Sequence, residues 1–195
     1  MGTIKIRLID TDVILNLILM QKRSNIHLGL GSPNETFNII TTDIVCQEVQ
    51  SGINRAKKTK EYKNISINED EIKRLERIWI EIKELIIIKS GMADPIRLRD
   101  RGEQSLVNLS LEYKNGVKIV SNNKKDVYKF LREHGISTKI HETPFEFYEE
   151  MFKLWFKDYK DVIKFMIIAN NDFRVFDKNH LGMNTILLQN GLKTQ

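Results

Sequence analysis

Three acidic residues stand where their side chains could do chemistry. Asp10 directly follows the apolar run 4–9. Glu48 lies in the first turns of a predicted helix after a second apolar run, and Glu103 lies at the start of a later predicted helix. In a parallel sheet such positions gather along one edge, where converging carboxylates repel each other unless a cation neutralises them. Mg²⁺ and Mn²⁺ prefer such oxygen ligands, and a bound cation could activate water to attack a phosphodiester.

Each acid also has a simpler explanation, which the spacing leaves open. Glu103 follows Asp100 by three residues, so the two could form a helix capping box. Glu48 could lie on the solvent face of an amphipathic helix. Thr11 or Asp12 could be only the N-cap of the first helix, because a short oxygen-bearing side chain accepts a hydrogen bond from the free amides there.

The elements that must position these acids follow from hydrophobic periodicity and turn residues. Strands alternate with helices along the chain, which predicts a doubly wound α/β/α sandwich with a mainly parallel sheet. Residues 22–36 are expected to form a loop, Ser51-Gly52 to end the second helix, and Asn68 with Glu71 to form a capping box. The expected strands are 4–9, 37–42, 85–88, 117–121 and 138–141, and the expected helices are 13–21, 44–49, 72–85, 100–113 and 124–134.

The pattern changes to helices alone from about residue 144. We therefore expect an α/β domain over residues 1–155 and a helical C-terminal extension over 156–195. Aromatic residues are frequent between Phe145 and Tyr159, and this stripe is expected to pack in a core, with base stacking as the alternative. A structural or assembly role for this segment stays open.

The composition is that of a globular protein with a mild basic excess. The chain has 195 residues, of which 41% are hydrophobic, and carries a formal net charge of +5. Basic residues cluster in 54–63, which indicates either a solvated surface loop or a phosphate-contacting segment that includes Lys57 and Lys58. Lys124 and Lys125 follow the strand 117–121 and are further candidates for holding a nucleic-acid backbone.

Other sequence features restrict the compartment and the chemistry. Cys46 is the single cysteine, so no internal disulfide forms and a reducing, cytoplasmic location is expected. No uncharged run of membrane-spanning length and no signal-peptide pattern is present, so no membrane association is expected. The histidines lack metal-ligand spacing, and no phosphate-binding or dinucleotide fingerprint occurs.

Four short motifs, in order, resemble those of the PIN-domain family of nucleases. Residues 8–15 (Leu-Ile-Asp-Thr-Asp-Val-Ile-Leu) resemble the opening strand that ends in an acid, and 42–49 (Thr-Asp-Ile-Val-Cys-Gln-Glu-Val) resemble the second motif. Residues 101–109 (Arg-Gly-Glu-Gln-Ser-Leu-Val-Asn-Leu) resemble the Gly-Glu-x-Ser helix of one branch of the family. Residues 119–125 (Ile-Val-Ser-Asn-Asn-Lys-Lys) resemble the fourth motif.

The resemblance implies that residues 1–155 form a PIN-like nuclease domain, and that it cleaves RNA in a reaction that depends on Mg²⁺ or Mn²⁺. Asp10, Glu48 and Glu103 would hold the metal and Asp12 would stand beside the site. Many members are toxins of toxin–antitoxin pairs, usually dimeric and inhibited by a cognate antitoxin protein. The neighbouring polar residues expected to support the site are Thr11, Asn123 and Ser105.

The chain departs from the family pattern at the fourth motif. Asn122 and Asn123 stand where the family usually has an acid. The amide oxygen of Asn122 can ligate a hard metal but brings no negative charge, so affinity for the metal, above all for a second one, should fall. The alternative function is a degenerate PIN fold that binds nucleic acid or a protein partner without cleaving it.

Overall fold

A computed structural model describes residues 5–24, 37–62, 65–83, 87–88, 100–113 and 116–155. The predicted C-terminal extension, 156–195, and most of the predicted loop 22–36 lie outside these residues. Within them, no helix is both long enough and apolar enough to cross a membrane.

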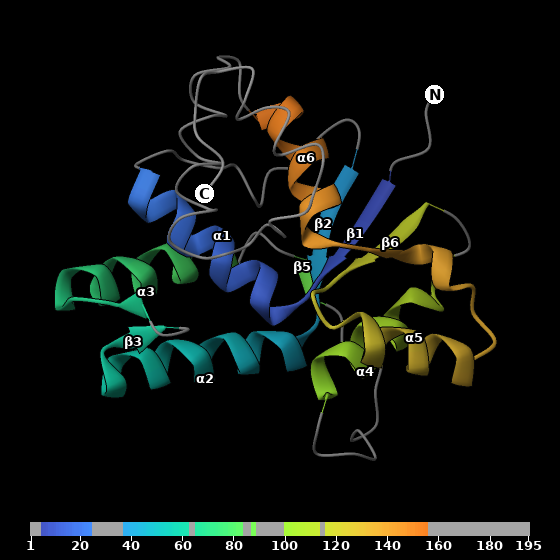
Figure 1. The fold of residues 1–195 in the computed structure, drawn as a ribbon, viewed down its shortest axis with the longest axis horizontal. Coiled ribbons are helices and arrows are strands. Elements are labelled where there is room, and N and C mark those ends of the chain that lie inside the picture. Colours follow the sequence, from blue (N-terminus) through green and yellow to red (C-terminus); the bar gives the residue numbers. More distant parts are fainter. Residues whose placement is uncertain are drawn as a thin grey trace.

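The centre of the described structure is a sheet of five parallel strands in the order β5-β2-β1-β6-β7 (Figure 1). Each of the sequence-predicted strands overlaps an observed one, the last of them only at His141. The strands are β1 (Lys5–Ile9), β2 (Phe37–Thr41), β5 (Ile87–Ile88), β6 (Val117–Val120) and β7 (His141–Glu142).

Helices connect the strands, as the alternating pattern predicted. Figure 1 shows α6 and α1 on one side of the sheet and α4 and α5 on the other. The fold is therefore α/β with a parallel sheet, consistent with the doubly wound arrangement. The helices are α1 (Thr11–Ser24), α2 (Asp43–Thr59), α3 (Glu69–Lys83), α4 (Arg101–Ser110), α5 (Lys124–Glu133) and α6 (Pro144–Trp155).

The strand order reverses next to β1. From β1 the chain moves to β2 and β5 on one side, and then returns to β6 and β7 on the other side. In open α/β sheets the crevice at the carboxyl ends of the strands beside such a reversal is the usual ligand site. Ile9 pairs with Val120, so Asp10 and Ser121 leave their strands side by side.

The core lies between the sheet and the helices. Leu8 and Ile119 of the sheet, Val45 of α2 and Val107 of α4 are all fully buried. Tyr148 of α6 is also fully buried, so the aromatic stripe is confirmed as core at that position. This packing holds the first residues of α1, α2, α4 and α5 at the same edge of the sheet as Asp10.

Two helix caps are present, and the first of them was predicted. Asn68 accepts a hydrogen bond from the Glu71 amide at 2.8 Å and Glu71 accepts one from the Asn68 amide at 3.1 Å, which confirms the capping box before α3. Thr42 is the N-cap of α2, since its hydroxyl accepts from the Val45 amide at 3.2 Å.

Two local predictions were wrong, and two of the simpler explanations that the sequence left open do not apply. α1 begins at Thr11, so neither Thr11 nor Asp12 is its cap. α2 continues through Ser51-Gly52 to Thr59, because one glycine costs a helix only about 1 kcal/mol and packing compensates. The last predicted strand is a 3₁₀ turn at Thr138–Ile140 followed by β7. Finally, Asp100 makes no side-chain capping bond and adopts a left-handed conformation, so the capping box with Glu103 does not form.

A candidate metal site at the carboxyl ends of the strands

An open depression of about 490 Å³ lies at the strand reversal. It receives residues from the ends of β1 and β6 and from the first turns of α1, α2 and α4. It brings together all three predicted catalytic acids and four of the predicted neighbours. The lining residues are Asp10, Thr11, Asp12, Glu48, Glu103, Asn122 and Asn123.

Asp10 is held by two donors at the bottom of this depression. Its side chain and backbone together are only 5% exposed. Oδ1 accepts a hydrogen bond from the Thr11 amide at 2.7 Å, and Oδ2 accepts one from the Ser121 hydroxyl at 2.7 Å. The two bonds fix the plane of the carboxylate, because each of its oxygens is tied to a different strand end.

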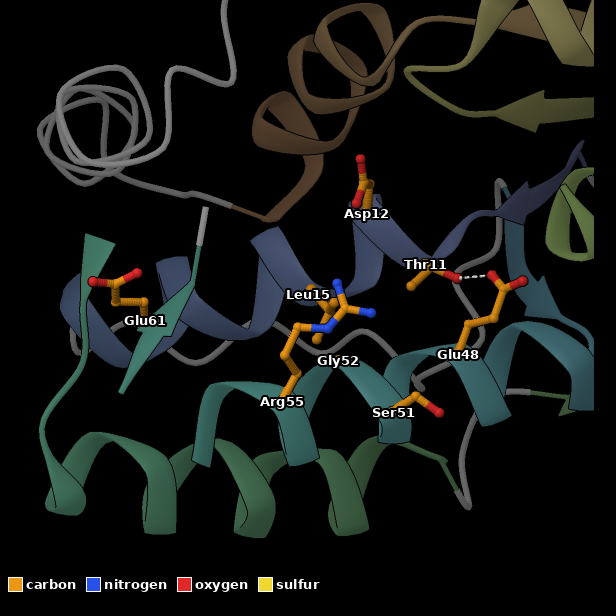
Figure 2. Close-up of a pocket in the computed structure, with 8 residues that line it drawn as sticks. All are labelled: Thr11, Asp12, Leu15, Glu48, Ser51, Gly52, Arg55 and Glu61. Carbon is orange, nitrogen blue, oxygen red and sulfur yellow. Dashed lines mark hydrogen bonds between the residues drawn. The ribbon is translucent and has the colours of Figure 1, made fainter. Parts of the chain in front are cut away.

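Glu48 reaches the same place from α2. Its Oε2 accepts a hydrogen bond from the Thr11 hydroxyl at 2.7 Å, which Figure 2 shows, and its Oε1 accepts from the Gly102 amide at 3.1 Å. Glu48 is half-buried and bonded at both oxygens, so it is not a simple solvent-facing residue of an amphipathic helix.

Gly102 makes this close approach possible. A Cβ atom at Gly102 would lie 2.6 Å from Oε2 of Glu48 and 3.3 Å from Oδ1 of Asp10. Both carboxylates therefore crowd the same point on α4, and a side chain there would displace Glu48. The glycine of the predicted Gly-Glu-x-Ser helix thus has a steric reason in this chain.

Glu103 is oriented by one of the two asparagines. The Asn123 side-chain amide donates to Oε1 of Glu103 at 2.9 Å, and the Asn123 backbone amide donates to the Ser121 hydroxyl at 3.0 Å. Ser121 and Asn123 together connect Glu103 to Asp10. Asn123 therefore acts as a donor to an acid, whereas Asn122 is exposed at the rim and lines the depression.

The electrostatics of the depression are strongly negative. Burial, and next the charge of Glu103, raise the pKa of Asp10 to about 7. Burial also raises the pKa of Glu103, and the charges of Glu48 and Asp100 add to this effect. No basic side chain is among the described residues that line the depression. The described lining residues therefore leave the negative charge of the depression uncompensated.

The donor set fits a hard divalent cation in kind. Carboxylate oxygens are the ligands that Mg²⁺ and Mn²⁺ prefer, and they come here from three separate elements. Across the ranges that the structure describes, however, no three acidic, histidine or cysteine side chains are gathered as closely as in a preformed metal centre. A cation would therefore have to draw the carboxylates together.

Ser105 lies behind the site rather than in it. Its buried hydroxyl donates to the Gly102 carbonyl at 2.7 Å and is 2.6 Å from the Thr42 hydroxyl, which must then be the donor of that pair. This contact ties the first turn of α4 to the N-cap of α2. Ser105 therefore sets the positions of the helices that carry Glu48 and Glu103.

The predicted nucleic-acid-binding lysines divide into two groups. Lys57 forms an ion pair with Glu76 of α3, so the structure gives it a partner within the protein. Lys58 is exposed on the last turn of α2. Lys124 and Lys125 are exposed on the first turn of α5, directly after Asn123, and Lys124 lies 5.2 Å from the ring centre of Tyr128. Only this second pair adjoins the acidic depression in the chain.

Sequence reasoning did not single out Ser121 and Gly102 as members of the site. The signal for Ser121 was its place, since it is the first residue after β6 just as Asp10 is the first after β1. The signal for Gly102 was weak, because a glycine in a first helical turn usually needs no special reason.

Comparisons with protein-family models, with curated proteins and with solved structures found no match. The resemblance to PIN domains thus rests on the four motifs of the chain itself.

Proposed function

We propose that this protein is a metal-dependent endoribonuclease of the PIN type. The observation that carries the proposal is the convergence of Asp10, Glu48 and Glu103 on one depression at the strand reversal, with the pKa of Asp10 raised to about 7. A structural role gives no reason to gather three acidic side chains with no basic side chain among them. A cation-dependent reaction does, because the cation compensates the charge.

The residues of the site would divide the work between holding and orienting. Asp10, Glu48 and Glu103 would hold Mg²⁺ or Mn²⁺, with the amide oxygen of Asn122 as a further ligand. When bound, such a cation supplies Lewis acidity that polarises a phosphate and activates water. Because Asp10 retains its proton up to about pH 7, binding of the cation would release that proton.

The donors around the acids keep these carboxylates in place. Thr11 donates to Asp10 and Glu48, and Ser121 donates to Asp10. Asn123 donates to Glu103. Such outer contacts commonly change metal affinity by about 10–100-fold when they are removed.

The substrate in this proposal is RNA. Lys124 and Lys125 would contact its phosphates beside the site. Lys58, which lies further from the site along α2, would contact phosphates of a more distant part of the RNA. The family resemblance extends the proposal to a toxin of a toxin–antitoxin pair that is inhibited by a cognate protein and forms a homodimer.

Cleavage of an RNA pool tests the proposal directly. We expect fragments with Mn²⁺ or Mg²⁺, and neither with EDTA nor with the Asp10→Asn variant. The matched control is Asp70→Asn, which makes the same change at an exposed position in the first turn of α3. Cleavage that is equal in all conditions, or absent with every metal, contradicts the proposal.

A second candidate is a PIN-like fold that binds RNA or protein without cleaving. The observation that favours it is the pair Asn122 and Asn123 in place of a fourth acid, with Asn123 used as a donor rather than as a ligand. Calorimetric titration with Mn²⁺ separates the two. An isotherm that disappears in Asp10→Asn supports the nuclease, whereas no binding at millimolar Mn²⁺ supports the non-cleaving fold.

A further inference from the structure

A second cleft begins at the acidic depression and runs between α1 and α2. It holds about 360 Å³ and shares Thr11, Asp12 and Glu48 with the depression, so the two form a continuous path. This volume is at the small end of the range of ligand pockets. Beyond the shared residues it is lined by Leu15, Ser51, Gly52, Arg55 and Glu61.

Gly52 opens the floor of this cleft. A Cβ atom there would lie 2.9 Å from Cδ1 of Leu15, so α1 and α2 approach each other closely at this point. Figure 2 shows Arg55 one turn further along α2, with its guanidinium group beside Leu15 and directed between the two helices. The cleft thus contains one cation, Arg55, together with the carboxylates of Asp12, Glu48 and Glu61. Its floor is closed by Leu15, which is only 6% exposed.

Arg55 differs from two other cations near the end of α2, Lys57 and Lys60. Lys57 pairs with Glu76 and Lys60 pairs with Glu69, both on α3. Within the described part of the chain, no carboxylate lies at ion-pair distance from Arg55. The helix therefore turns some of its basic residues to α3 and directs Arg55 to the cleft.

The spacing between Glu48 and Arg55 suits an RNA strand that passes through the acidic depression. Arg55 follows Glu48 by seven residues, which is about two turns or roughly 10 Å along α2. A planar guanidinium group binds phosphate through paired hydrogen bonds.

We propose that this cleft is a substrate subsite in which Arg55 binds a phosphate of single-stranded RNA next to the cleaved position. The subsite rests on the proposed nuclease function, because it extends the path of the same substrate. It makes Arg55 a binding residue that positions the strand and does not touch the reacting phosphate.

Binding of a fluorescent single-stranded RNA of about ten nucleotides tests the subsite. Fluorescence anisotropy would be measured on the full chain that carries Asp10→Asn, so that no cleavage interferes. Adding Arg55→Gln should weaken binding about tenfold, the size expected for one hydrogen-bonded charge, and should lower the slope of log K against log salt by about 0.7. Arg55→Lys should keep most of that slope.

Two further variants make the test specific. Arg77→Gln removes the same charge from an exposed position on α3 that lines neither cleft, and it should leave binding unchanged. Gly52→Gln puts a side chain on the floor of the cleft and should weaken binding without unfolding α2, because it removes a helical glycine. Circular dichroism checks that each variant is folded.

The outcomes separate this proposal from the proposed function. RNA binding that depends on Arg55, in a protein that never cleaves RNA with any metal, supports the subsite and contradicts the proposed nuclease function. Cleavage by the unmodified chain together with equal affinities of Arg55→Gln and Arg77→Gln removes the subsite alone. A chain that does not bind the RNA at all overturns the subsite.

Discussion

Two buried ionisable residues, three positions apart in the chain, have opposite electrostatic surroundings. Arg7 lies within β1 and is 4% exposed, and Asp10 directly follows β1 and is 5% exposed. Arg7 forms ion pairs with Glu142 of β7 and Glu150 of α6. Asp10 has only uncharged donors, and the nearest charges that affect its pKa are those of other acids.

The pKa shifts show the physical difference. Burial raises the pKa of Glu142, and the charge of Arg7 offsets part of that rise. The pKa of Asp10 is raised by burial, and Glu103 raises it further. A charge buried for stability is neutralised within the fold, whereas a charge buried for binding is left for a ligand to neutralise. This contrast is the strongest physical support for the proposed metal site.

Replacing Asp10 by Asn should have the largest effect, and it should separate function from stability. We expect cleavage of RNA to fall roughly 10³-fold, because one acid of a cooperating set is lost. The stability of the metal-free protein at pH 8 should rise, since a repelled buried charge is removed. Activity assays and thermal unfolding in EDTA measure the two. A variant that unfolds at a lower temperature than the unmodified chain would contradict the contrast.

Replacing Arg7 by Met should mainly destabilise the fold. Glu142 would be left as an uncompensated buried charge, at a cost of about 3–5 kcal/mol and a fall in Tm of roughly 10 °C. The control is Lys5→Met, which removes an exposed pair with Glu150 worth at most about 1 kcal/mol.

Adding Glu142→Leu to Arg7→Met should recover part of the lost stability. An unchanged Tm in the single Arg7→Met variant would show that the ion pairs do not hold β7 and α6 to β1.

Replacing Gly102 by Ala should disturb the site and spare the fold. The added Cβ would meet Oε2 of Glu48 at 2.6 Å, so the carboxylate must move, and we expect Mn²⁺ affinity to fall about 10–100-fold. Stability should change by no more than about 1 kcal/mol, because alanine is the better helix former. Calorimetry measures the affinity.

Gly52→Ala is the matched control for this substitution. It changes another helical glycine, and its Cβ meets only the flexible end of Leu15. Equal Mn²⁺ affinities for the two variants would argue against Glu48 as a ligand.

The pH dependence of stability should reveal the raised pKa of Asp10. The unfolded chain gives up the Asp10 proton near the ordinary aspartate pKa of 3.8, whereas the folded chain keeps it until about pH 7 because burial and Glu103 raise the pKa. The resulting stabilisation is therefore complete below pH 4 and is lost as pH rises to 7, with a slope of at most about 1.4 kcal/mol per pH unit. Chemical unfolding in EDTA from pH 5 to 8 measures it.

Other groups also titrate in this range, so the informative quantity is the difference between the unmodified chain and Asp10→Asn. That difference should grow with pH. Saturating Mn²⁺ at pH 8 should restore the stability of the unmodified chain but not raise that of Asp10→Asn. A difference that is constant with pH would mean that Asp10 titrates normally.

Much of the fold could be predicted because its signals are local. The apolar run before Asp10 predicted β1 and its end, and Asn68 with Glu71 predicted the start of α3. Both depend on residues that are neighbours in the chain. The predictions that were wrong concern local signals that packing overrides, such as Gly52, where contact with Leu15 lets α2 continue.

By itself, the sequence determined that acids follow strand ends, because an apolar run that stops at a carboxylate is a local pattern. Only the tertiary structure decided which of them meet. Ser121 donates to Asp10, which is 111 positions away in the chain. Asn123 donates to Glu103, whereas the sequence showed it only as a position where an acid was missing. The pairing of Arg7 with Glu142 and Glu150 was equally invisible, since side chains this distant in sequence are brought together only by strand order and helix packing.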